Sequence, residues 1–261
     1  MERSNAKDFY ENIHREVDGS AGDPKTHAAY KYIKEFIENY DLYEKKCLEI
    51  GSSKGIYQDI VRDYTGLDII VSLKKYYHKP FFVVNDDGTY PFENNTFDAI
   101  WSNAVHEHIA NIDQALFELK RVLKKDGLVF FWPAWFCSSW AAEGYAVRPY
   151  SALSLRGKLI KASILFRGSL LWRSLFIFPK RLYSHVNYVL GKKYETMRNK
   201  KLKANYEVFW GSDSDACNSL DPHDAILWFE SNGFQCLSHP MHLQAFLVRH
   251  RPIIVKKVKD G

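Results

Sequence analysis

The sequence has no long hydrophobic run and few cysteines. An apolar-rich stretch without a charged residue, Gly127 to Ala142, is sixteen residues long and contains Pro133. A membrane-spanning helix needs about 20 apolar residues, so this stretch is too short to cross a bilayer.

The cysteines are scattered, without the spacing of a metal site or a redox pair: Cys47, Cys137, Cys217 and Cys236. Such scattered cysteines favour reduced thiols.

The N-terminal residues lack the pattern of a secretory signal. Residues 1–5 are polar and mixed in charge, whereas a signal peptide has a short basic region followed by an apolar one. Together with the scattered cysteines, this predicts a cytoplasmic protein.

One long segment has no acidic residue. Between Gly144 and Tyr194 there is no Asp or Glu, and the segment contains ten basic residues: Arg148, Arg156, Lys158, Lys161, Arg167, Arg173, Lys180, Arg181, Lys192 and Lys193. The rest of the chain has 26 basic and 31 acidic residues, so the net charge of +5 comes from this segment.

Hydrophobic residues make up 46% of the 261 residues, enough for a sizeable core. The most informative apolar run is Cys47–Ile50, which stops at Gly51. It predicts a buried parallel strand that ends in a tight turn, with Gly55 opening a helix over 56–61. In open α/β sheets ligands bind beyond the carboxyl ends of the strands, and glycine lets the backbone come close to them.

Polar groups follow the next strands as well. A second apolar stretch, 66–71, contains Asp68, a carboxylate that could accept hydrogen bonds from ribose hydroxyls. A third strand, 81–84, is followed by Asp86 and Asp87, which could accept a hydrogen bond from an exocyclic amine such as that of adenine. A turn-rich loop and a fourth strand then occupy 90–103.

Further elements follow from apolar spacing and capping residues. Helices are expected over 27–40, where the helix could close over a cofactor, from the capping residue Asp113 to Gly127, and from Asp221 to Gly233. Strands are expected over 128–132, 234–238 and 243–250.

In this order and spacing the chain resembles the class I S-adenosylmethionine-dependent methyltransferases, in particular the group with an LPF…FD segment followed by an EH dipeptide. The matching residues are Leu48-Glu49-Ile50-Gly51 with Gly55, Gly66-Leu67-Asp68, Asp86, Tyr90-Pro91-Phe92, Phe97-Asp98, Glu107-His108-Ile109, and Arg121-Val122-Leu123-Lys124 with Gly127.

The resemblance implies an α/β fold, a Rossmann-like sheet of seven strands with helices on both faces. It divides the chain into an N-terminal helical segment (1–44), a cofactor-binding core (45–133), an insertion (134–220) and a C-terminal helix and strands that complete the core (221–261). The insertion after the fifth strand is expected to be helical, and to form a lid or cap.

The resemblance also implies the cofactor, S-adenosylmethionine, and roles for single residues. Glu49 and Gly51 would shape the loop under the methionine half, and Asp68 would hold the ribose. Asp86, with the backbone of Asp87, would contact the adenine.

Asn103 and Ala104 would border the sulfonium, and Ser53 and Gly55 complete the expected cofactor-binding loop. Ser53 stands where the family has a glycine, so the backbone φ angle there decides how closely a cofactor can approach. Lys54 adds a positive charge beside a cationic cofactor and is expected to point to solvent.

For catalysis the candidates are His106 and His108, just beyond the fourth strand, which could accept a proton from a hydroxyl acceptor. In related quinone O-methyltransferases the pattern E-x-x-E-H is associated with a metal. Here Ala104 replaces the first acid, so no metal is expected.

The basic and aromatic insertion has three interpretations. It could be a helical cap with solvated Lys and Arg, a peripheral membrane contact through 152–183 suited to a lipid-linked acceptor, or a nucleic-acid surface. It could equally be a dimer interface, and the oligomeric state is not readable from the sequence. We do not expect a nucleic-acid partner, because no Asn-Pro-Pro-Tyr type motif follows the fourth strand.

The function expected from the sequence is O-methylation of a small-molecule or lipid- or glycan-linked acceptor with S-adenosylmethionine. Two alternatives stay open. One is a non-catalytic binding protein with the same fold, motivated by Ser53 and Ala104, and the other is an RNA methyltransferase, motivated by the basic insertion.

Overall fold

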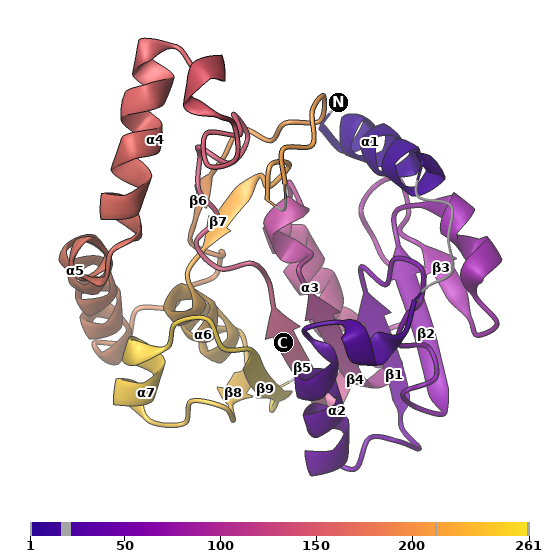
Figure 1. The fold of residues 1–261 in the computed structure, drawn as a ribbon. Helices are drawn as coiled ribbons and strands as arrows, with labels where there is room; N and C mark the ends of the chain where they lie inside the picture. The colour runs from indigo at the N-terminus through magenta and orange to yellow at the C-terminus, as the bar shows by residue number, and fades with distance from the viewer. Residues whose placement is uncertain (1, 17–21, 212, 260–261) are drawn as a thin grey trace.

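The computed structural model describes residues 2–16, 22–211 and 213–259 (Figure 1). Positions 1, 17–21, 212 and 260–261, which belong to the expected segments 1–44, 134–220 and 221–261, lie outside the described residues.

A seven-stranded sheet forms the centre of the molecule, in the order β3-β2-β1-β4-β5-β9-β8. The first five strands in sequence pair in parallel, and β9 is antiparallel to both β5 and β8. The strands are β1 (Lys46–Ile50), β2 (Asp63–Asp68), β3 (Phe81–Val83), β4 (Phe97–Asn103), β5 (Leu123–Trp132), β8 (Phe234–Cys236) and β9 (Ile253–Lys257).

Helices cover both faces of this sheet (Figure 1). On one face α2 (Tyr30–Asn39) packs Ile33, Phe36 and Ile37 in one apolar cluster with Trp101 and Phe130 of the sheet. On the other face α3 (Ile112–Val122) and α6 (Pro222–Ser231) share a second cluster with β1, β4 and β5. The expected fold class, a seven-stranded sheet with helices on both faces, is confirmed.

The N-terminal helix α1 (Glu2–Glu16) precedes α2, and short 3-10 helices occur between the larger elements. These are η1 (Pro24–Thr26), η2 (Val71–Tyr76), η3 (His106–His108) and η4 (Tyr150–Ala152).

The prediction of a helix after Gly55 is wrong. Residues 53–59 form successive turns, with N–H groups bonding three residues back, as from Gly55 to Ser52 and from Gln58 to Gly55. Ser53 and Gly55 have φ angles of 46° and 68°, so the backbone is left-handed where a helix would have to start.

The C-terminal elements also differ from expectation. The strand expected over 234–238 is present as β8, but 243–250 is not a strand. Instead α7 (His242–Leu247) occupies that segment, and the seventh strand is β9. The helix expected over 113–127 begins earlier, at Ile112, because Asn111 rather than Asp113 accepts the capping hydrogen bond. It also ends earlier, at Val122, because β5 begins at Leu123.

The insertion after β5 contains two long helices, as expected, and a small sheet that was not expected. Helices α4 (Leu155–Gly168) and α5 (Leu170–Val189) lie at one side of the molecule (Figure 1). They are followed by an antiparallel pair, β6 (Asn199–Lys201) and β7 (Asn218–Leu220).

A buried ion pair ties α5 to the core. The Arg181 guanidinium donates to both oxygens of Asp221 at 2.8 to 3.1 Å, and also to the Phe246 carbonyl at 2.6 Å. The two side chains are only 3% and 8% exposed. Asp221 also caps α6 by accepting from the His223 N–H, so one carboxylate holds two helices together.

We predict that Arg181→Ala lowers the free energy of unfolding by about 3–5 kcal/mol, because it leaves the buried Asp221 carboxylate without a counter-charge. Urea denaturation measures the change. Arg156→Ala, which removes an exposed arginine from α4, is the control and should stay within about 0.5 kcal/mol of the parent. Equal stability of the two variants would show that the pair does not anchor the insertion.

Candidate functional site

A cavity of about 500 Å³ opens beyond the carboxyl ends of β1, β2 and β4. This volume lies in the usual range for a small-molecule or cofactor site. Its walls come from residues after each of these strands, from α1 and from the insertion: Gly51 and Ser53, Asp68 to Ile70, Ala104, Val105, Glu107 to Asn111, Ala6 and Tyr10, and Tyr206, Phe209, Asp213 and Asp215.

The turn after β1 is shaped by one close approach. Gly51 has a φ angle of 71°, and a Cβ atom there would lie 2.1 Å from Cγ2 of Val105. Gly51 is therefore needed both for its left-handed backbone and for the space that Val105 occupies. Gly55 does not line the cavity, and a Cβ there would lie 2.6 Å from the Tyr77 ring.

Three residues of the cavity wall adopt positive φ without being glycine. These are Ser53 (46°), Ala104 (53°) and Asp213 (71°). Such conformations are uncommon outside glycine and gather at functional sites, where the surrounding structure holds them. Ser53 is thus left-handed, like the glycine expected at its position, and its N–H is directed to Asp68. The neighbouring Lys54 places its ammonium 4.9 Å from the centre of the Tyr76 ring, and it does not line the cavity.

Asp68 is held by the backbone at the end of β2. Its carboxylate accepts from the N–H groups of Ser53 at 2.8 Å, Ile69 at 2.7 Å and Ile70 at 3.3 Å. Burial raises the pKa of Asp68 above its usual range, although these three hydrogen bonds act in the opposite direction. Asp68 lines the cavity with its carboxylate fixed in place.

Glu49 lies in the core rather than at the cavity. It is 5% exposed and accepts a hydrogen bond of 2.5 Å from the Tyr64 hydroxyl. Burial raises its pKa to about 8, with the Tyr64 hydrogen bond opposing the shift, so Glu49 is mostly protonated at neutral pH.

The loop after β3 reaches the cavity through other residues than expected. Asp86 and Asp87 do not line it, whereas Val84, Gly88 and Tyr90 do. The Asp87 side chain accepts from the N–H and hydroxyl of Thr89, which turns it back into the loop.

Two amides from the start of α3, Asn111 and Gln114, line the cavity instead. Gln114 donates to the Asp87 carbonyl at 2.7 Å, so α3 and the loop are joined at this wall.

The end of β4 separates the two candidate histidines. His106 is completely buried, with its Nδ1 3.1 Å from the Ser102 hydroxyl and its ring against Phe131. Burial lowers its pKa to about 3. His106 does not line the cavity, so a role as the catalytic base has no geometric support; Asn103 does not line it either, although the adjacent Ala104 does.

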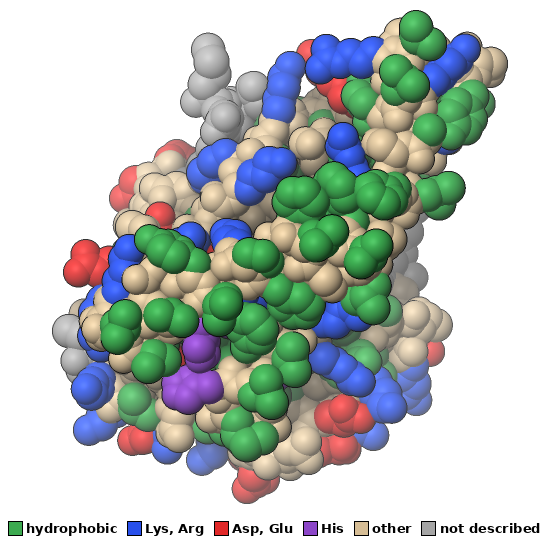
Figure 2. Space-filling view, turned by 90° about the vertical axis from the view of Figure 1, so that its left-hand side faces the viewer, with side chains coloured by type: hydrophobic (Ala, Val, Ile, Leu, Met, Phe, Trp, Pro, Cys, Tyr) green, Lys and Arg blue, Asp and Glu red, His purple; other side chains and the backbone are tan. Residues whose placement is uncertain are grey.

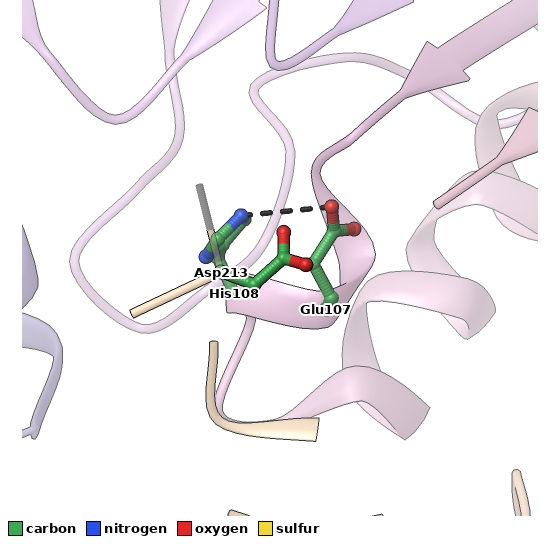
Figure 3. Close-up of side chains that lie close together, drawn as sticks. All are labelled: Glu107, His108 and Asp213. Atoms are coloured by element: carbon green, nitrogen blue, oxygen red, sulfur yellow. Dashed lines mark ion pairs between the residues drawn. The ribbon is translucent and has the colours of Figure 1, made fainter. Parts of the chain in front are cut away.

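His108 does line the cavity, and its ring pairs with the Glu107 carboxylate (Figure 3). Its Nε2 lies 3.5 Å from Glu107, and its Nδ1 lies 3.0 Å from Asp215, off the line of a straight hydrogen bond. Burial alone would lower the pKa of His108, but Asp215 and Glu107 outweigh it and raise the pKa to about 9. His108 is therefore an imidazolium at neutral pH.

The carboxylates around His108 differ from one another. Both oxygens of Glu107 are buried, and no described side chain donates a well-aligned hydrogen bond to them. Burial raises the pKa of Glu107 despite the His108 charge. Burial also raises the pKa of Asp213. The pKa of Asp215 is shifted in the opposite direction. Burial acts to raise it, but His108 and the Tyr10 hydroxyl hold it below the ordinary value.

Glu107, His108 and Asp213 each offer a ligand atom within 4.8 Å of the others, close enough for one divalent cation to contact all three (Figure 3). Oxygen and imidazole nitrogen are ordinary ligands of Zn²⁺ and Mn²⁺. Such an ion would have to displace the proton from His108. The expectation that the site works without a metal remains a prediction.

Several residues of this site escaped the sequence reasoning. Tyr10 comes from α1, while Tyr206, Phe209, Asp213 and Asp215 come from the chain between β6 and β7. It is α1, and not the helix over 30–39, that reaches the cavity. One available signal was that Asp213 and Asp215 are two acids close together at the end of an otherwise basic insertion.

Residues 48–131 match a family model described as a methyltransferase domain. The match runs from β1 to β5 and so includes every strand whose end contributes to the cavity. This part of the chain is therefore a methyltransferase domain with the class I fold, and the family implies S-adenosylmethionine as its cofactor. No curated protein matches the chain.

Solved structures align with parts of this chain at low identity. A protein of Bacillus halodurans aligns over 75% of this chain and 64% of its own, with 13% identity and a TM-score of 0.41. An S-adenosylmethionine dependent methyltransferase from Mesorhizobium loti aligns over 46% and 59%, with 11% identity and a TM-score of 0.40. The YcgJ protein of Bacillus subtilis aligns over 40% of this chain and 51% of its own, with 20% identity and a TM-score of 0.33. This chain therefore spans about half of that protein.

We predict that Gly51→Ala destabilises the protein more than Gly22→Ala. Both glycines have positive φ, so each change costs about 1–2 kcal/mol of backbone strain. Among the described residues only Gly51, of these two glycines, has a neighbour in the way, and overpacking adds about 1–3 kcal/mol. Chemical denaturation of both variants tests this. Combining Val105→Ala with Gly51→Ala should recover the stability lost to overpacking, but not the stability lost to backbone strain. Equal destabilisation by the two glycine changes would contradict the role given to Val105.

We also predict that His108 titrates near pH 9. Its folded pKa lies above the value of about 6.5 expected in the unfolded chain, so its contribution to stability is complete below about pH 6.5 and is lost as the pH rises towards 9. Histidine-selective NMR measures the titration.

Asp215→Asn should lower the pKa of His108, whereas Asp59→Asn, beside the exposed His78, should not change it. A neutral His108 at pH 7 in the metal-free protein would contradict the assignment.

Proposed function

We propose that the protein transfers a methyl group from S-adenosylmethionine to an oxygen of a small-molecule or lipid-linked acceptor. The observation that supports this most is the pairing, in one cavity of a methyltransferase domain, of a fixed Asp68 carboxylate with the cluster of Glu107, His108 and Asp213. Since β1 lies between β2 and β4, the ends of those strands are on the order of 10 Å apart, enough for a nucleoside at one end and an acceptor at the other.

The cavity walls suit S-adenosylmethionine. Asp68 keeps one lone pair free for a ribose hydroxyl, and the apolar side chains of Ile69, Ile70 and Val84 can pack against an adenine ring. In this proposal Asn111 and Gln114 take the place of Asp86 and Asp87 at the adenine edge. The left-handed turns at Gly51 and Ala104 let the backbone approach the methionine half closely.

When bound, S-adenosylmethionine supplies a methyl group already activated by a sulfonium. The protein then has to align the acceptor and to remove its proton, and alignment is the larger contribution. Asp213 is the group we assign to the proton, because it lines the cavity and is more exposed than Glu107. His108 contributes a fixed positive charge that stabilises the oxyanion as the proton leaves.

We predict that Asp68→Asn weakens binding of S-adenosylhomocysteine about 10- to 100-fold, through the loss of charge-assisted hydrogen bonds of about 1.5–3 kcal/mol each. Calorimetry measures the affinity. Asp63→Asn, at the opposite end of the same strand, is the matched control and should bind like the parent. Unchanged affinity in Asp68→Asn would remove Asp68 from the site, and no binding by the parent would favour a non-catalytic protein with this fold.

The same variants test the transfer step. Purified protein is incubated with methyl-labelled S-adenosylmethionine and separate lipid, small-molecule and RNA fractions of a cell extract. We expect label in the lipid or small-molecule fraction with the parent and with Asp63→Asn, and little with Asp68→Asn. Label in the RNA fraction alone would identify an RNA methyltransferase and overturn the proposed acceptor class.

A further inference from the structure

Helix α5 exposes apolar side chains along its whole outer face. Leu171, Leu175, Leu182, Val186 and Val189 follow one another at intervals of three, four or seven residues, and they are 66%, 60%, 57%, 47% and 62% exposed. Intervals of this kind place side chains on one side of a helix. A surface helix normally presents charged and polar residues on that side.

The inner face of α5 is already used by the core. Arg181 and Ser184 are buried there, and Phe178 stacks on Phe246 of α7 at 5.6 Å between ring centres. The core therefore covers the inner side of α5 only. The outer side is apolar as well, and no described residue covers it.

The exposed side chains of α5 continue onto the neighbouring helices. Figure 2, which views the molecule from the side of α4, α5 and α7, shows hydrophobic side chains gathered across this face with Lys and Arg around them. We call this surface the apolar face; it consists of Leu155, Leu159, Leu165, Phe166, Leu170, Leu171, Leu175, Phe176, Leu182, Tyr183, Val186, Val189, Leu190, Met241, Leu243 and Leu247. Contiguous exposed patches of this extent mark interaction sites.

The charged residues on the helices of the apolar face are all basic. No acidic residue occurs between Gly144 and Tyr194, and exposed basic residues lie on the same elements or directly after them: Arg156, Lys158, Arg167, Lys192, Lys193 and Arg249. A partner that covers this face must therefore accept apolar side chains in its centre and present negative charge around them.

We propose that the apolar face binds the surface of a membrane containing anionic lipids. Leucine, phenylalanine and tyrosine side chains would enter the boundary between headgroups and acyl chains, and each basic residue beside them would add about 1 kcal/mol of attraction to anionic headgroups. None of the described helices is long and apolar enough to cross a membrane. In this proposal helix α5 lies along the bilayer surface.

A second copy of the chain fits this face less well. A two-fold interface would place the basic residues of one copy close to those of the other, and like charges brought together repel. An anionic membrane instead satisfies both the apolar centre and the basic surroundings.

The proposal is independent of methyl transfer. No residue of the apolar face lines the cavity described above, so vesicle binding and cofactor binding can be measured separately on the same variants.

Vesicle flotation with the full chain tests the proposal. We expect the parent to float with vesicles of phosphatidylcholine and phosphatidylglycerol, to float much less with phosphatidylcholine alone, and to lose binding as salt is raised. The triple variant Leu175→Gln, Leu182→Gln, Val186→Gln should bind the anionic vesicles roughly 100-fold more weakly, because three apolar side chains no longer enter the interface.

The control is Tyr43→Gln, Val71→Gln, Val147→Gln, which changes three apolar residues that are 55%, 56% and 60% exposed elsewhere on the molecule. It should float like the parent, and both triple variants should bind S-adenosylhomocysteine as the parent does. Failure of the parent to float, or equal flotation of the two triple variants, overturns the proposal. A parent that is dimeric by light scattering, and that only the α5 triple variant converts to a monomer, would assign the face to a second copy instead.

Discussion

The contact between Gly51 and Val105 is the constraint on which the cavity depends. It brings the chain leaving β1 against the chain leaving β4 with no room for a side chain at position 51. Ala104 must then turn through a left-handed conformation, with its N–H bonded to the Trp132 carbonyl at 2.9 Å. The short helix that follows places His108 at the cavity and His106 in the core.

The second feature of the site is that its charged cluster is assembled from distant parts of the chain. Glu107 and His108 come from the methyltransferase domain, whereas Asp213 and Asp215 come from the insertion and Tyr10 from the first helix. This end of the cavity therefore exists only when the insertion is folded against the core. The ion pair of Arg181 with Asp221 is one of the interactions that hold it there.

The sequence was sufficient for the central strands, because continuous apolar runs that end in glycine or an acid have few other interpretations. It was insufficient at 243–250, where a short apolar segment fits a helix as well as a strand. It was also insufficient after Gly55, whose own backbone is left-handed where the helix would have to start. The residues immediately after β1 and β2 could be placed at the cavity because strand ends of a parallel sheet meet at one edge.

Other site residues could not be placed in this way. Two histidines two positions apart look equivalent in sequence, but a 3-10 turn directs them to different sides, which only the local backbone decides. Asp213, Asp215 and Tyr10 reach the site through long-range packing that no local pattern encodes. The Asp98 of the FD motif, by contrast, turned out to join strands: it accepts from the Lys46 N–H and pairs with Lys124.

The left-handed residues Ser53, Ala104 and Asp213 have a consequence for how this protein can change under selection. Glycine would relieve the backbone strain at each of them, at a cost in the rigidity of the cavity wall. Selection for heat resistance alone would therefore favour glycine at these three positions and erode the pocket, while selection that also requires turnover would keep them. A library of survivors sorted by both criteria would thus outline the working part of the cavity without any knowledge of its ligand.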